Sequence, residues 1–361
     1  MTPKVFKKFM VDVAIPDRRT VCVQSKPGMG KTSLFEQIVE DMSKKVGEDF
    51  PWFLFHTSVN SPTDMRGLGF ADRDKDGIAK KAVWLPYGDM YELTQINKPC
   101  LATFDDFGQT SESVQKACMQ IFGQKELNGM KIRKEVTLSV ATNTMTDYSG
   151  VVPILHAIKE RWDTIVELEY EMEDHIEWLW GQDAAVETVY YLKFQGANLI
   201  REAKPTKDFV NIPSPRTVFK LDRWVKKWNE ILAMFNGQRH QEEKANSFLT
   251  EIGEGIVGKG YITSFMNFRR IYMHLPNLDE IIANPSKFPV PLETDIRIAL
   301  EGALVNKADI KNFDAIYAFL KRLDADESTA TMMDIAQVKP DLKKTKSFLD
   351  WATKNANYLI D

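Results

Sequence analysis

Residues 25–32 read Ser-Lys-Pro-Gly-Met-Gly-Lys-Thr, directly after an apolar run and at the start of an amphipathic segment. Glycines at this spacing turn several backbone N–H groups toward one point, where the N-terminus of the following helix also favours phosphate oxygens. Lys31 supplies a charge for the outer phosphates, and the Thr32 hydroxyl is a ligand for Mg²⁺. The pattern predicts a nucleotide site made by Ser25, Lys26, Pro27, Gly28, Met29, Gly30, Lys31, Thr32 and Ser33. Ser25 stands where glycine is usual in this pattern.

Two adjacent carboxylates, Asp105 and Asp106, end a second apolar run. In a parallel sheet the carboxyl ends of the strands meet at the edge where ligands bind. We expect Asp105 to hold Mg²⁺, directly or through water, and Asp106 to orient or deprotonate the attacking water. Many ATPases of this type have glutamate at the second position, and aspartate is one methylene shorter. Because a misplacement of about 1 Å costs on the order of a hundredfold in rate, either the site draws Asp106 closer or hydrolysis is slow.

Three further polar residues complete the candidate set. Asn143 ends another apolar run and is expected to hydrogen-bond the γ-phosphate or the attacking water. Arg161 ends a short helix, where its guanidinium is expected to reach a neighbouring subunit's site. The alternative for Arg161 is a salt bridge within its own subunit, to Glu160 or Asp163. Arg216 opens a predicted helix and is expected to approach the phosphates from a lid domain.

The elements that must hold these residues alternate between strands and helices in the first half of the chain. Strands are predicted over residues 20–24, 51–59, 101–104 and 136–141, and helices over 31–46 and 111–122. This alternation predicts a parallel sheet with helices on both faces. The polar stretch 67–84 is interpreted as a hairpin or insertion, and helical patterns dominate from about Glu171. We expect a nucleotide-binding α/β core over 1–170, a helical lid domain over 171–325 and a C-terminal helical tail over 326–361.

The composition is that of an ordinary globular chain. Of 361 residues, 43% are hydrophobic and 27% are charged, and the formal net charge of -4 creates no strong field toward nucleic acid or anionic lipid. Three cysteines at irregular spacing argue against a disulfide framework and a zinc site. No run approaches the roughly 18 apolar residues that span a bilayer, and the first residues do not form a signal-peptide pattern. We therefore expect a cytoplasmic protein with no membrane partner.

The ordered set of motifs resembles the MoxR branch of the AAA+ ATPases, in the small form found in bacteria and phages. Lys-Pro-Gly-Met-Gly-Lys-Thr is similar to its Walker A motif and Phe-Asp-Asp-Phe to its Walker B motif. Ala-Thr-Asn143 resembles sensor 1, Ala-Ile-Lys-Glu-Arg161 the arginine-finger segment and Ser-Pro-Arg216 sensor 2. The match covers residues 18–230, with Ser25, Asp106 and Trp162 as departures.

The resemblance implies a homo-oligomeric, hexameric ring that binds ATP and Mg²⁺ at its subunit interfaces and remodels or chaperones partner proteins. It also implies a partner protein with a von Willebrand A domain, and the cytoplasm of a bacterium or of a phage-infected host. Two alternatives stay open. One is an ATP-driven motor or loader that acts on nucleic acid, which the absence of a recognisable nucleic-acid module in the sequence disfavours. The other is a nucleotide-gated scaffold that hydrolyses ATP slowly, which Asp106 motivates.

Overall fold

The computed structural model describes residues 1–145 and 150–355, and it divides into two compact units. The first unit holds residues 1–171 together with the loop residues 204–208. The second holds residues 172–203 and the chain from residue 209 onward. Within the described residues, no helix combines the length and the apolar character needed to cross a membrane.

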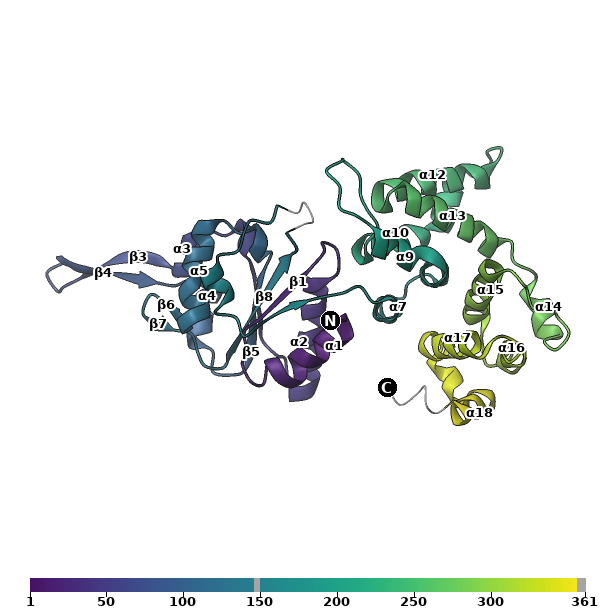
Figure 1. The fold of residues 1–361 in the computed structure, drawn as a ribbon, viewed down its shortest axis with the longest axis horizontal. Helices are drawn as coiled ribbons and strands as arrows, with labels where there is room; N and C mark the ends of the chain where they lie inside the picture. The colour runs from purple at the N-terminus through teal and green to yellow at the C-terminus, as the bar shows by residue number, and fades with distance from the viewer. Residues whose placement is uncertain (146–149, 356–361) are drawn as a thin grey trace. The chain divides into compact units, whose positions relative to one another are not determined.

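A five-stranded parallel sheet forms the centre of the first unit (Figure 1). Its strands, in spatial order, are β2 (Trp52–His56), β5 (Cys100–Asp105), β8 (Val136–Asn143), β1 (Val21–Ser25) and β9 (Thr164–Glu167). The sequence identifies four of these strands and misses β9, a four-residue edge strand on which three residues are at least partly exposed. The strand predicted over 51–59 is too long, because the chain turns into a short 3₁₀ helix at Thr57–Val59.

Helices cover both faces of this sheet, as the alternation of elements predicts. Successive side chains of β1 point to opposite faces: Val21 and Val23 belong to one apolar core and Cys22 to the other. The first core is completed by α1 (Pro3–Phe9), the π-helical turn Met10–Ala14 and α2 (Lys31–Val46). The second is completed by α4 (Gly88–Gln95), α5 (Glu112–Gln124) and α6 (His156–Lys159).

All three cysteines of the chain, Cys22, Cys100 and Cys118, are free and buried in the first unit. Burial raises the pKa of each thiol, to about 12 for Cys100. The side chains therefore stay protonated and act as small apolar core residues.

The polar insertion forms an antiparallel hairpin that projects from the sheet in Figure 1. Its strands are β3 (Leu68–Arg73) and β4 (Ala79–Leu85), and it follows the short helix α3 (Pro62–Arg66). Gly67 begins the hairpin with a φ of 84°, and a Cβ there would lie 2.4 Å from the carbonyl oxygen of Leu85. Both the backbone angle and the close approach therefore require glycine at this position.

The second unit contains helices α7 to α18. They are α7 (Met172–Gly181), α8 (Val186–Tyr191), α9 (Ala197–Glu202), α10 (Pro215–Val225), α11 (Trp228–Met234), α12 (Gln241–Val257), α13 (Lys259–Met273), α14 (Leu278–Ala283), α15 (Thr294–Lys307), α16 (Phe313–Leu320), α17 (Ala325–Val338) and α18 (Lys346–Lys354).

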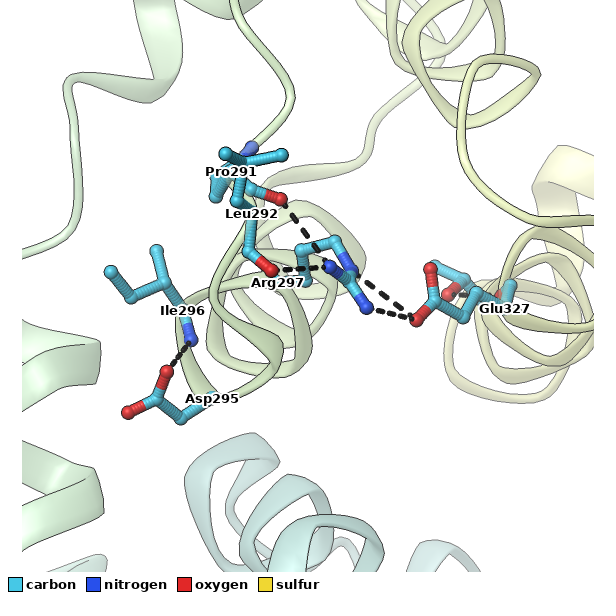
Figure 2. A network of polar contacts seen from close by, with 7 residues as sticks. Pro291, Leu292, Asp295, Ile296, Arg297 and Glu327 are labelled. Atoms are coloured by element: carbon cyan, nitrogen blue, oxygen red, sulfur yellow. Dashed lines mark hydrogen bonds and ion pairs between the residues drawn. The ribbon is translucent and has the colours of Figure 1, made fainter.

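An ion pair joins α15 to α17 in this unit (Figure 2). The Nε and Nη2 atoms of Arg297 donate to Oε1 of Glu327 at 3.3 and 3.2 Å, and Nη1 donates to the carbonyl oxygen of Leu292 at 2.8 Å. One turn further along α15, Glu301 is only 6% exposed, and its Oε1 has no hydrogen-bond partner among the described residues. Burial, followed by the charge of Glu327, raises the pKa of Glu301 to about 8. Glu301 is therefore mostly neutral at pH 7.

This carboxyl group is expected to make the stability of the helical unit depend on pH. Between its ordinary pKa of 4.5 and its folded value of about 8, folded Glu301 holds a proton that the unfolded chain releases. The free energy of unfolding should therefore fall as pH rises through this window, by at most about 1.4 kcal/mol per pH unit. Urea denaturation at several pH values should show a flatter dependence for Glu301→Gln, and Glu254→Gln on the exposed face of α12 is the control. Equal slopes for Glu301→Gln and the parent would contradict this assignment.

Candidate functional site

The predicted phosphate loop connects β1 to α2 at the carboxyl edge of the sheet. Gly28 and Gly30 have φ angles of 78° and 82°, in the left-handed region. A Cβ on Gly30 would meet no atom within 4 Å, so the backbone angle, and not the space, requires glycine there. Helix α2 begins at Lys31, directly after Gly30. The first N–H groups of this helix have no partner within it and are suited to an anion.

The Lys31 side chain is buried within this loop, with 7% of its surface exposed. Its Nζ donates to Oδ1 of Asn143 at 2.6 Å and to Oγ of Ser25 at 3.1 Å. Ser25 and Asn143 face each other in the register of β1 and β8, so the sheet itself brings both oxygens to the ammonium group. Ser25, which the sequence shows only as a departure from glycine, thus supplies a hydroxyl that accepts from the lysine.

The two predicted metal ligands lie side by side. The Thr32 hydroxyl donates to Oδ2 of Asp105 at 2.7 Å, and Asp105 is 4% exposed. One hydroxyl and one carboxylate form a small set of hard oxygen donors. This set fits Mg²⁺, which keeps several waters and binds substrate phosphates through its remaining positions.

Asp106 has an unusual backbone conformation. Its φ of 54° lies in the left-handed region, and its N–H donates to Oδ1 of Asp105 at 2.9 Å. Aspartate and asparagine adopt this conformation several-fold more often than other side-chain-bearing residues. The backbone at the end of β5 therefore gives a physical reason for an aspartate at this position.

A chain of buried hydrogen bonds supports the acidic pair, and sequence reasoning did not identify it. The Thr57 hydroxyl donates to the carbonyl oxygen of Asp105 at 2.8 Å, and the Thr110 hydroxyl donates to that of Thr57 at 2.6 Å. The Gln115 amide donates to the carbonyl oxygen of Thr110 at 3.2 Å and accepts from the N–H of Leu155 at 3.1 Å. Thr57, Thr110 and Gln115 are fully buried. A polar residue on the apolar face of α5 was the available signal for Gln115.

Arg161 follows α6 and lies on the exposed surface of the first unit. Its Nη1 donates to the carbonyl oxygen of Ala157, and the described residues provide it with no carboxylate partner. Glu160 and Asp163, the carboxylates of the alternative interpretation, each have another partner. Among the residues that the structure describes, Arg161 therefore has no salt bridge that would explain it within its own subunit.

Arg216 is exposed in the first turn of α10, in the helical unit. Pro215 occupies the first helical position, and the hydroxyl of Ser214 accepts from the N–H of Thr217 at 3.3 Å as the N-cap. The sequence predicts this helix over residues 217–228, and the structure begins and ends it earlier, at Pro215 and Val225. The approach of Arg216 to the phosphates stays a prediction.

The strand order β2-β5-β8-β1-β9, with the phosphate loop after β1 and the acidic pair after β5, is the α/β P-loop fold of the AAA+ type, followed here by a helical unit. No family model and no curated protein matches the chain. Among solved structures, it is similar to the RuvB Holliday junction branch migration motor of Thermotoga maritima, with 13% identity, 89% of this chain and 86% of that chain covered, and a TM-score of 0.40.

Two further solved structures have comparable similarity. A putative ATPase from Cytophaga hutchinsonii has 15% identity, with 70% of this chain and 80% of that chain covered and a TM-score of 0.33. A DNA polymerase III gamma subunit-related protein from Thermotoga maritima has 10% identity, with 99% and 98% covered and a TM-score of 0.36. The strand order and the glycine-rich loop between β1 and α2 define the fold of this chain.

The Lys31→Ala substitution is expected to weaken ATP binding by at least about tenfold, because it removes a charged donor aimed into the phosphate loop. Calorimetric titration with ATP and Mg²⁺ measures this loss directly. Lys44→Ala is the matched control, since Lys44 lies on the same helix but is exposed and pairs with Glu40. The assignment of the loop fails if the Lys31 variant binds ATP as tightly as the control.

Proposed function

We propose that this chain is an ATPase of the MoxR type that assembles into a hexameric ring and couples ATP hydrolysis to the remodelling or chaperoning of a partner protein. The observation that carries the proposal is the convergence of Lys31, Thr32, Asp105 and Asn143 at one edge of the parallel sheet. These are the residue types that bind phosphates and Mg²⁺ in nucleotide hydrolases.

Each residue has a defined task in this proposal. Lys31 exchanges the oxygens of Asn143 and Ser25 for oxygens of the β- and γ-phosphates, and the loop N–H groups bind the remaining phosphate oxygens. Thr32 and Asp105 hold Mg²⁺, which neutralises charge on the phosphates when bound. Asp106 orients the attacking water and accepts its proton, while the Asn143 amide hydrogen-bonds the γ-phosphate or the water.

The remaining two residues, Arg161 and Arg216, act on a site outside their own subunit or unit. Arg161 presents its guanidinium to the site of the neighbouring subunit, and Arg216 approaches the phosphates from the helical unit. Consistent with this role, the Arg161 guanidinium is exposed, and no carboxylate in the described residues neutralises it. The resemblance to the MoxR branch further suggests a partner with a von Willebrand A domain and a location in the cytoplasm of a bacterium or a phage-infected host.

Two other functions remain as alternatives, and each predicts a different result in measurements of ATP binding and hydrolysis. A motor or loader that acts on nucleic acid would show ATP hydrolysis that DNA or RNA stimulates. A slowly hydrolysing scaffold would bind ATP tightly with little turnover. The short side chain of Asp106 is the observation that favours the scaffold over a fast motor.

The Asp106→Asn substitution is expected to retain ATP and trap the loaded state. Asparagine also adopts the left-handed backbone angle of this position, so the change removes the charge while leaving the fold intact. Turnover should fall by roughly 10² to 10⁴, the usual contribution of a general base, while ATP affinity is kept. Asp106→Glu, measured in parallel, shows whether the aspartate limits the rate. Hydrolysis at the parent rate in Asp106→Asn would exclude Asp106 as the water-activating group.

Mixing two inactive variants tests whether Arg161 acts on a neighbouring subunit. Lys31→Ala subunits lack a working phosphate loop, and Arg161→Ala subunits lack the arginine, which in other nucleotide hydrolases contributes on the order of 10³ to 10⁵ in rate. Some interfaces of a mixed ring pair an intact loop with an intact Arg161, so ATP hydrolysis should reappear in the mixture.

Formation of mixed oligomers is verified by native mass spectrometry in the same samples. Mixed oligomers without restored hydrolysis would rule out action in trans. A parent protein that stays monomeric at high concentration with ATP and Mg²⁺ would rule out the shared site.

A further inference from the structure

The segment that carries Arg161 is held against α5 at several points along that helix. Near the start of α5, the Gln115 side chain accepts from the N–H of Leu155 at 3.1 Å. Near its end, the ring of Phe122 packs edge-on against the ring of Trp162, with 6.0 Å between centroids. The chain on both sides of Arg161 is thus fixed to one helix.

The side chain of Arg161 passes over Gly123, in the last turn of α5. A Cβ built on Gly123 would lie 2.7 Å from Nε and 3.1 Å from Cδ of Arg161, and no other residue supplies its nearest atoms. Gly123 does not have a left-handed backbone angle, so the turn of the chain does not require glycine there. Glycine is a poor helix former compared with alanine. The passage of the arginine side chain over the helix is therefore the contact that explains glycine at this position.

We propose that Gly123 is a positioning residue for Arg161. The bare Cα of Gly123 lets the arginine stem lie against α5, while Nη1 donates to the carbonyl oxygen of Ala157. The direction in which the guanidinium leaves the subunit is set by these two contacts. Helix α5 also holds the loop after Asp106, through the hydrogen bond from Gln115 to the carbonyl oxygen of Thr110. One helix therefore positions both the water-activating loop of its own subunit's site and the arginine that enters the site of the neighbouring subunit. This inference rests on the proposed function, in which Arg161 acts in trans.

The test is Gly123→Ala. The added methyl group clashes with a flexible side chain, so the guanidinium is expected to move while the helix stays in place. Thermal stability should equal or exceed that of the parent, because alanine favours the helix more than glycine does. ATP affinity should equal that of the parent, and kcat should fall by about a hundredfold, the effect of a displacement of about 1 Å. Gly255→Ala, on an exposed turn of α12 where a Cβ meets nothing within 4 Å, is the matched control and should keep the parent kcat.

Mixing separates a positioning defect from damage to the subunit's own site. Gly123→Ala subunits, which keep an intact phosphate loop, should regain hydrolysis when mixed with Lys31→Ala subunits, which supply an undisturbed Arg161. The inference is overturned if Gly123→Ala keeps the parent kcat. It is also overturned if mixing fails to rescue Gly123→Ala while it rescues Arg161→Ala.

If mixing rescues neither variant, the proposed action of Arg161 in trans has failed, and the position of the arginine is then decided by crystal structures. Parent and Gly123→Ala crystals should differ in where the guanidinium of Arg161 lies. The same guanidinium position in both would overturn the role of Gly123 independently of the function.

Discussion

The candidate site depends on one buried positive charge. A charged side chain that is buried in this way is stable only where oxygen atoms replace its lost water, and the ammonium group of Lys31 receives them from Ser25 and Asn143. Those two residues are register partners on the neighbouring parallel strands β1 and β8. The pairing of these strands therefore fixes where the ammonium group of Lys31 can lie. A slip of one residue in this register would turn Asn143 to the opposite face and leave the charge without that partner.

The same requirement for satisfied polar groups explains how the acidic pair is held. Thr57, Thr110 and Gln115 come from three different segments, yet each is fully buried and hydrogen-bonded to the next. A buried polar chain of this kind tolerates little movement, since any break leaves a desolvated donor or acceptor. The end of β5 is therefore held by buried hydrogen bonds at the point where Asp106 adopts its left-handed backbone.

Local patterns in the sequence predicted the parts of this arrangement that local physics decides. The helix over 31–46 matches α2 at both ends, because glycines in the left-handed conformation flank it. The helix predicted from residue 111 begins one residue later, since the Ser111 hydroxyl caps it. Contacts between residues that lie far apart in the sequence could not be predicted from such local patterns. Nothing near Gln115 in the sequence shows that it meets Leu155. The apolar run that contains β9 is visible in the sequence, but a strand of four residues is too short to be identified from such a run alone.

The burial of Cys22, Cys100 and Cys118 has a practical consequence for spectroscopy on this protein. Thiol reagents attack the thiolate, and all three native thiols are shielded and resistant to ionisation. A cysteine introduced at an exposed position, such as Asp76 at the turn of the projecting hairpin, would therefore react selectively with a maleimide dye or a spin label. The natural chain is thus already a suitable background for distance measurements between labelled copies, without removal of its own cysteines.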